Sequence, residues 1–131
     1  MKEDPDTRRR SQRYTLNDTV FLTFRPQFDR MGRLKDISKN GVGFEYVAID
    51  SSTYSGDSTK IEVDIFSGSK DFNLSRVPCE VVYDVKISAS SGTGLFENRR
   101  CGLQFSDLST YQVAQLGHLL NTCAAEPVPY L

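Results

Sequence analysis

The chain has 131 residues, 38% hydrophobic and 25% charged, with a formal net charge of −1 and a pI of about 5.8. This length suits one domain with a single core, and its apolar stretches are too short to cross a bilayer, so we expect no membrane insertion. The acidic pI argues against a general nucleic-acid binder. Because the first residues are polar and acidic and lack the apolar region of a secretory signal, we expect a cytoplasmic protein.

The charges are unevenly distributed along the chain. Residues 1–35 hold 9 Lys and Arg against 5 Asp and Glu, whereas residues 36–131 hold 7 against 12. Four of the early arginines fall within residues 8–13, a density that suits a small anionic ligand, although a solvated basic arm would look the same. Residues 1–13 show no apolar periodicity, so we expect a flexible arm that is mobile until a ligand orders it.

Six segments are rich in Val, Ile, Phe and Tyr or alternate apolar with polar residues, which is typical of strands. They are separated by turn residues and polar loops such as 50–59 and 88–93, with no helical period between them. Many short strands of this kind predict an all-β antiparallel barrel or sandwich of the Greek-key type, over residues 14–124. The predicted strands are residues 19–24, 33–37, 42–47, 60–66, 78–87 and 99–105.

The C-terminal region has a different pattern. Ser109 and Gln112 have the spacing of a capping box, and Val113, Leu116 and Leu120 follow at helical spacing. These residues predict one α-helix over about 109–122 that packs against the barrel. Two prolines in residues 127–129 prevent its continuation, so residues 125–131 are expected to form a tail.

The sequence offers little material for catalysis or metal binding. Cys79, Cys101 and Cys123 are far apart and form no CxxC pair, and His118 is the single histidine. We expect reduced thiols, with Cys79 and Cys101 as small hydrophobic residues in strands. No glycine-rich phosphate loop or nucleophile motif occurs. The sequence therefore predicts no enzyme activity, no metal and no cofactor.

Residues 36–41, Asp-Ile-Ser-Lys-Asn-Gly, lie between two predicted strands and have the composition of a tight turn. We expect Gly41 to take the positive φ that a short hairpin requires. A hairpin would use Asp36, Ser38 and Gly41 even without a ligand, so the turn alone does not establish a binding site.

The arm and the turn together resemble the signature of PilZ domains. Arg9 and Arg13 form R-x-x-x-R, and Asp36, Ser38 and Gly41 form D-x-S-x-x-G, in the family's order. Residues 41–44, Gly-Val-Gly-Phe, and 100–105, Arg-Cys-Gly-Leu-Gln-Phe, are also similar to the family's strands, so the resemblance spans roughly residues 8–122. It implies a six-stranded antiparallel β-barrel with a C-terminal α-helix, and binding of cyclic di-GMP.

The resemblance also implies roles for the motif residues. Arg9 and Arg13 would bind phosphate or guanine, because a guanidinium forms bidentate hydrogen bonds and stacks on bases. Asp36 would accept hydrogen bonds from guanine, Ser38 would offer its hydroxyl, and Gly41 would permit close backbone approach. Arg8, just before the motif, would stack on a second guanine and favour an intercalated pair of ligands.

The function implied is that of an effector or adaptor whose arm changes conformation on binding cyclic di-GMP and relays the signal to an unidentified downstream protein. One alternative is a PilZ-like adaptor that binds no nucleotide. Another is a small nucleic-acid-binding barrel that uses aromatic residues as base platforms, although aromatic residues in strands are more often core. The aromatic candidates are Phe21, Phe24, Phe44, Tyr46, Phe66 and Phe105.

Overall fold

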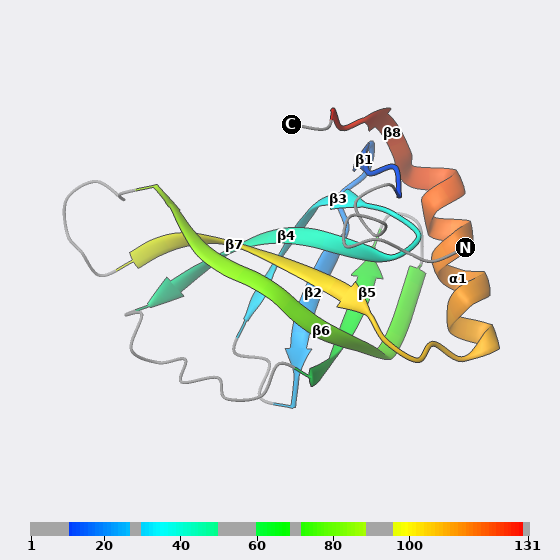
Figure 1. Ribbon diagram of the computed structural model, residues 1–131, viewed down its shortest axis with the longest axis horizontal. Coiled ribbons are helices and arrows are strands. Elements are labelled where there is room, and N and C mark those ends of the chain that lie inside the picture. Colours follow the sequence, from blue (N-terminus) through cyan, green and yellow to red (C-terminus); the bar gives the residue numbers. More distant parts are fainter. Residues whose placement is uncertain (1–10, 27–29, 50–59, 69–71, 89–95, 130–131) are drawn as a thin grey trace, which may run out of the picture.

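The computed structural model of the protein describes residues 11–26, 30–49, 60–68, 72–88 and 96–129. Within them, six antiparallel strands close into a barrel in the order β2-β5-β6-β7-β4-β3, and β3 pairs back with β2 (Figure 1). Two short strands, β1 and β8, extend the sheet beyond β3. The elements are β1 (Tyr14–Leu16), β2 (Phe21–Arg25), β3 (Met31–Ile37), β4 (Gly41–Ile49), β5 (Lys60–Ser67), β6 (Phe72–Ser88), β7 (Phe96–Phe105), α1 (Thr110–Cys123) and β8 (Ala124–Pro127).

The predicted fold class is confirmed: a closed six-stranded antiparallel barrel with one C-terminal helix. Each predicted strand corresponds to one of the strands β2 to β7. The largest difference in bounds concerns β6, which begins at Phe72, well before the predicted start at residue 78. The predicted loop 50–59 lies outside the described residues, as does the predicted loop 88–93 except for Ser88, which is the last residue of β6.

A bulge near the start of β6 explains that difference. Opposite Asp64, the register of β5 and β6 shifts, and Arg76 on β6 adopts a φ of 56°. The Arg76 backbone N–H donates to the Asp64 carboxylate at 3.0 Å. A bulge interrupts the two-residue alternation by which a strand is recognised in a sequence, so the segment before it escaped the pattern.

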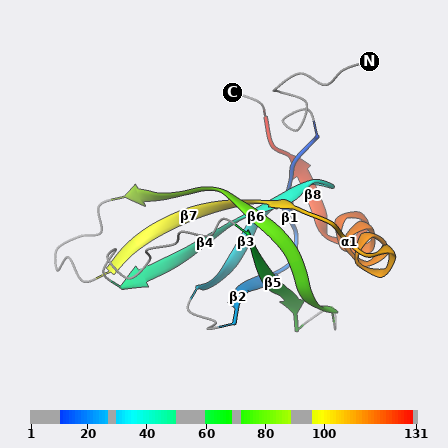
Figure 2. The same cartoon turned by 60° about the horizontal axis from the view of Figure 1, so that its bottom comes forward.

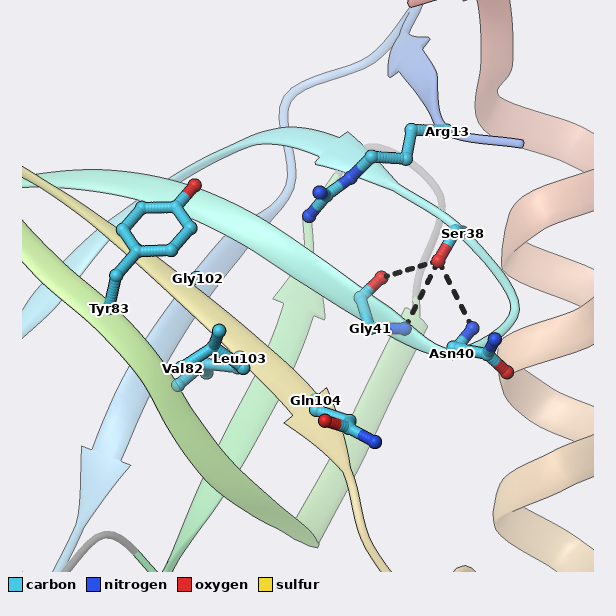
Figure 3. A pocket seen from close by; sticks show the side chains of 9 residues that line it. All are labelled: Arg13, Ser38, Asn40, Gly41, Val82, Tyr83, Gly102, Leu103 and Gln104. Atoms are coloured by element: carbon cyan, nitrogen blue, oxygen red, sulfur yellow. Dashed lines mark hydrogen bonds between the residues drawn. The ribbon is translucent and has the colours of Figure 1, made fainter. Parts of the chain in front are cut away.

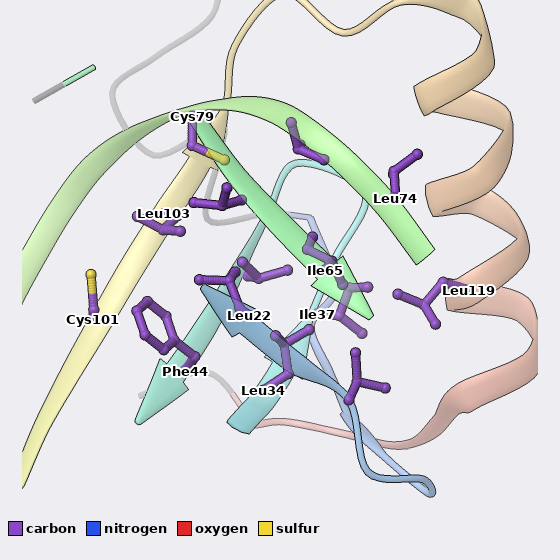
Figure 4. Close-up of a cluster of buried hydrophobic side chains, with 14 of the residues drawn as sticks. Leu22, Leu34, Ile37, Phe44, Ile65, Leu74, Cys79, Cys101, Leu103 and Leu119 are labelled. Carbon is purple, nitrogen blue, oxygen red and sulfur yellow. The ribbon is translucent and has the colours of Figure 1, made fainter. Parts of the chain in front are cut away.

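The barrel interior is filled by apolar side chains from every barrel strand and from α1 (Figure 4). Burial of this surface supplies most of the driving force for folding. All three cysteines are buried and free, as expected for Cys79 and Cys101. The largest fully buried apolar side chains are Phe44, Leu22, Ile37, Ile65, Leu119, Val20, Val42, Val63 and Val77.

Helix α1 lies across one end of the barrel, where Leu119 points toward Ile37 and Leu74 (Figure 4). Figure 2 shows that the far parts of β4, β6 and β7 extend away from this end. The capping box is present, with Ser109 and Gln112 bonding reciprocally. The expected stripe is confirmed at Leu116 and, in part, at Leu120, which packs against the core, but not at Val113. Leu116, Leu119 and Cys123 are buried, while Val113 is 55% exposed.

Strand β8 follows α1 directly and pairs antiparallel with β1. It occupies part of the segment assigned to the tail. Its residues have no apolar alternation, and its hydrogen bonds are made to a strand more than a hundred positions earlier. No helix among the described residues is long and apolar enough to span a membrane.

Candidate ligand-binding site

The turn between β3 and β4 is closed by Ser38. The Ser38 hydroxyl accepts from the backbone N–H groups of Asn40 and Gly41, at 3.1 and 3.2 Å. The Ser38 backbone N–H donates to the Gly41 carbonyl at 2.9 Å. Since the side chain is buried and these bonds occupy its hydroxyl, the structure gives Ser38 a turn-forming role.

Gly41 is required for a reason different from the expected one. It does not adopt the positive φ that we predicted from the turn. Instead, a Cβ at this position would lie 2.1 Å from the Leu103 carbonyl oxygen of β7, far inside van der Waals contact. Gly41 therefore permits β4 and β7 to pair closely at the base of the turn, where Gly41 faces Gln104.

Asp36, the last charged residue of β3, is buried, at 5% relative exposure. Its Oδ1 lies 3.3 Å from Nε of Arg13, which is itself 40% exposed. The distance between Arg13 and Asp36 is that of an ion pair, but the contact does not have the geometry of a hydrogen bond. Arg13 Nε and Asp36 Oδ1 are both buried, and neither has a hydrogen-bond partner among the described residues. Such unsatisfied buried groups carry a free-energy cost of about 1–3 kcal/mol each.

Arg100 on β7 holds the other oxygen of Asp36. Its Nη2 pairs with Asp36 Oδ2, and its Nη1 lies 3.1 Å from Glu45 Oε2 on β4. Arg100 Nε donates to the Tyr83 hydroxyl at 3.4 Å. Burial disfavours the charged form, but Tyr83 and the carboxylates of Asp36 and Glu45 more than offset this and raise the pKa of Arg100. Asp36 is thus held between two guanidinium groups.

A hollow of about 210 Å³ opens on the outer face of the barrel beside this ion-pair network (Figure 3). The Arg13 guanidinium extends toward it from one side and the Tyr83 ring stands on another. This volume is below the roughly 300–1,000 Å³ typical of pockets that enclose a small-molecule ligand. The hollow is lined by Arg13, Ser38, Asn40, Gly41, Val82, Tyr83, Gly102, Leu103 and Gln104.

Strand register explains why the hollow forms there. Gly41 pairs with Gln104, Gly43 with Gly102, and Glu45 with Arg100, so alternate positions of β4 and β7 present three glycines on the outer face. A Cβ on Gly102 would lie 2.3 Å from the Tyr83 ring, and one on Gly43 would lie 2.9 Å from Asp36. The missing side chains leave a shallow floor beside Tyr83 and Asp36.

The structure brings Arg13, Asp36, Ser38 and Gly41 together, as the two motifs led us to expect. Arg8 and Arg9 lie outside the described residues. Sequence reasoning missed Glu45, Tyr83 and Arg100 as neighbours of the motif. Strand alternation could have found two of them, because Glu45 and Arg100 share the outward parity of Gly43 and Gly102, but the register that pairs the strands had to be known first.

A second polar cluster lies at the barrel end away from α1, and it does not reach the hollow. The Asp84 carboxylate accepts from the Tyr46 hydroxyl at 2.6 Å and from Arg99 Nε at 2.9 Å, and it lies 3.3 Å from Arg30 Nη1. Burial first, and then the bond to Asp84, raises the pKa of Tyr46 far above its usual range. Both oxygens of the Asp84 carboxylate are engaged by these partners, so we interpret the cluster as one that stabilises the barrel.

The other candidate chemical groups lie away from the hollow. Desolvation raises the pKa of both Cys79 and Cys101 to about 12, which keeps these thiols protonated. His118 lies on the exposed face of α1. Among the described residues, no three His, Cys, Asp or Glu side chains are grouped as metal ligands.

The chain matches one family model and is similar to a solved structure. The family model described as the PilZ domain matches residues 7–122. Among solved structures, the chain is similar to the PilZ domain with c-di-GMP of YcgR from Escherichia coli, with a TM-score of 0.63 and 15% sequence identity, over 87% of this chain and 90% of that one. No curated protein matches the sequence.

Proposed function

The chain belongs to the PilZ domain family, and we propose that it is a receptor for cyclic di-GMP that binds in the hollow between Arg13 and the turn after β3. The solved PilZ domain of YcgR, which shares this fold, carries c-di-GMP. The single observation that supports the proposal most is the convergence of Arg13 from the arm with Asp36 and the Ser38 turn at one hollow.

The polar groups of this site complement the ligand. Guanine N1–H and the exocyclic amine are donors, and Asp36 Oδ1 is a buried acceptor without a hydrogen bond. Guanine O6 and N7 and the phosphate oxygens are acceptors, which suit the Arg13 guanidinium. Because Arg13 covers Asp36 Oδ1, its side chain must swing aside to admit guanine, and each group then gains the hydrogen bond that the 3.3 Å contact does not supply.

The remaining contacts come from the arm. The hollow is too small to enclose a dinucleotide, so a bound ligand must be covered from outside. Arg9, four positions before Arg13, brings a second guanidinium over the phosphates, and ordering of the arm is the conformational change. Arg8 stacks on the guanine of a second ligand molecule. The reordered arm then presents a new surface to a downstream protein.

The six aromatic residues considered as base platforms for a nucleic acid do not form a platform at the hollow. Phe24, Phe44 and Tyr46 are at most 5% exposed and belong to the core. Phe105 is partly buried against that core, while Phe21, at 37% exposure, packs on Phe66 with 5.8 Å between ring centroids. None of these six aromatic side chains lines the hollow, where Tyr83 is the aromatic residue among the lining residues, so the base platforms expected for a nucleic acid are not supported.

Calorimetric titration of the purified chain with cyclic di-GMP tests the proposal. Wild type should bind, while Arg9→Ala and Arg13→Ala should bind far more weakly. Equal binding by both variants would show that the assigned site is wrong. No binding by wild type would favour the adaptor without nucleotide. The same titration gives the stoichiometry: a value near two supports the stacking role of Arg8, and a value near one at saturation contradicts it.

A further inference from the structure

The C-terminal segment is hydrogen-bonded to the residues that carry the site's arginine. The Val128 backbone N–H donates to the Arg13 carbonyl at 2.8 Å. The Gln12 side-chain amide donates to the Val128 carbonyl at 3.2 Å and to the Arg13 carbonyl at 2.9 Å. Gln12 and Val128 therefore both bond to the Arg13 carbonyl and to each other, an arrangement we call the Gln12–Val128 clamp, and neither residue lines the hollow.

The Gln12–Val128 clamp is continuous with α1. Tyr14 pairs with Pro127 and Leu16 with Ala124, and the Asn17 N–H donates to the Cys123 carbonyl at 2.8 Å. At the other side of β1, only Tyr14 has a register partner on the barrel, Ile37 of β3. Since Leu119 and Cys123 are buried in the core, α1 and β8 attach the first of the described residues to the barrel.

This attachment matters because Arg13 is the third of the described residues, after Ser11 and Gln12, where the arm joins the barrel. An arginine on a free arm would lose backbone freedom when it engaged a ligand, and this loss would weaken binding. With its carbonyl held by Val128, only the side-chain torsions of Arg13 must change when it moves from Asp36 to the ligand.

We infer that strand β8 and Val128, together with Gln12, position Arg13 for the ligand, so that the C-terminal segment belongs to the binding machinery although it does not contact the hollow. This inference rests on the proposed binding of cyclic di-GMP. By linkage, a ligand held by Arg13 must in turn stabilise the hydrogen bond between Val128 and Arg13.

Two variants test the positioning role. One is Gln12→Ala; the other ends the chain after Glu126 and so removes Val128. Each should weaken binding of cyclic di-GMP about tenfold, as loss of prior ordering of one or two residues implies, with the thermal unfolding profile of the barrel retained. Thr15→Ala is the matched control. It removes a side-chain contact to Glu126 on the same strand pair but leaves the clamp intact, and it should bind as wild type does.

A double-mutant cycle separates positioning from general stabilisation. If Gln12 and Val128 act through Arg13, either change should alter affinity less than about twofold in an Arg13→Ala background. An equal effect in both backgrounds would overturn the inference. Ligand should also slow hydrogen exchange of the Val128 amide in wild type, and unchanged exchange would count equally against it.

The outcomes distinguish the inference from the function on which it rests. A wild-type chain that does not bind cyclic di-GMP overturns the proposed function and removes the basis of the inference. A wild-type chain that binds, with both clamp variants binding equally well, overturns the inference alone. If the shortened chain does not fold, the Gln12→Ala cycle still decides.

Discussion

The Nε atom of Arg13 lies 3.3 Å from Oδ1 of Asp36, and neither atom has a hydrogen bond within the described part of the chain. The two residues come from different motifs, one before the barrel and one at the end of β3. Their contact joins the arginine segment to the turn in a single site. It also leaves both groups able to form better hydrogen bonds with another molecule.

Replacement of Arg13 should affect binding through the geometry of its guanidinium. Arg13→Ala is expected to weaken binding of cyclic di-GMP by about thirtyfold or more, because it removes charge-assisted hydrogen bonds. Arg13→Lys should recover only part of this loss, since an ammonium cannot bond in bidentate fashion. Calorimetry measures both. Arg76→Ala, which removes an exposed guanidinium paired with Glu62 outside the hollow, is the control and should bind normally.

Asp36→Ala should lower both affinity and stability. It leaves Arg100 without its partner at the buried carboxylate and removes the acceptor proposed for guanine. We expect the free energy of unfolding to fall by about 1–3 kcal/mol in urea titrations. Asp107→Ala changes an exposed carboxylate before α1 and should leave stability nearly unchanged. Equal stability of the two variants would contradict the structural role of Asp36.

The glycines should differ sharply in their tolerance of a methyl group. Gly41→Ala places Cβ 2.1 Å from the Leu103 carbonyl, so β4 and β7 must separate and we expect a loss of about 1–3 kcal/mol. Gly117→Ala, in α1, meets no atom within 4 Å and should stabilise the helix by up to about 1 kcal/mol. Thermal and urea unfolding of both variants measure the contrast, and a tolerated Gly41→Ala would refute the close approach.

The cysteines should be inert while the protein is folded. Burial raises the pKa of Cys79 and Cys101 to about 12, so the reactive thiolate is scarce at pH 8. A thiol-specific chromogenic reagent should react with fewer than one thiol per chain under native conditions and with all three in denaturant. Fast reaction of the native chain would show that these strands open readily.

Asp64, which accepts a hydrogen bond from the bulge on β6, should make the stability of the protein fall at acidic pH. Burial raises the pKa of Asp64, but the bonds from Arg25 at 2.7 Å and from the Arg76 N–H outweigh it and lower the pKa. The resulting stabilisation is therefore present above the unfolded-state pKa and is lost as pH falls through the folded-state value. Asp64→Asn should destabilise the protein by about 1 kcal/mol at pH 7. The difference from wild type should shrink below about pH 4, and a pH-independent difference would refute the ionic contribution.

Strand composition predicted the barrel because alternation of buried and exposed residues is a local property, visible in segments such as Lys60–Ser67. Interruptions of that alternation were less visible. The bulge at Arg76 concealed the first part of β6, and β8 has no apolar pattern because its residues are mostly exposed. The buried face of α1 was misassigned at Val113, since helical spacing alone does not show which of two adjacent stripes meets the barrel.

The sequence by itself determined the six strands, the closing helix and the two motifs that contain Arg13, Asp36, Ser38 and Gly41, because these depend on residue type and local spacing. Tertiary structure decided what surrounds them. The register of β4 with β7 places Arg100 and Glu45 beside Asp36, and Val128, directly after β8, holds the Arg13 carbonyl. Contacts between residues so far apart in sequence depend on strand register and chain closure, which no local pattern encodes.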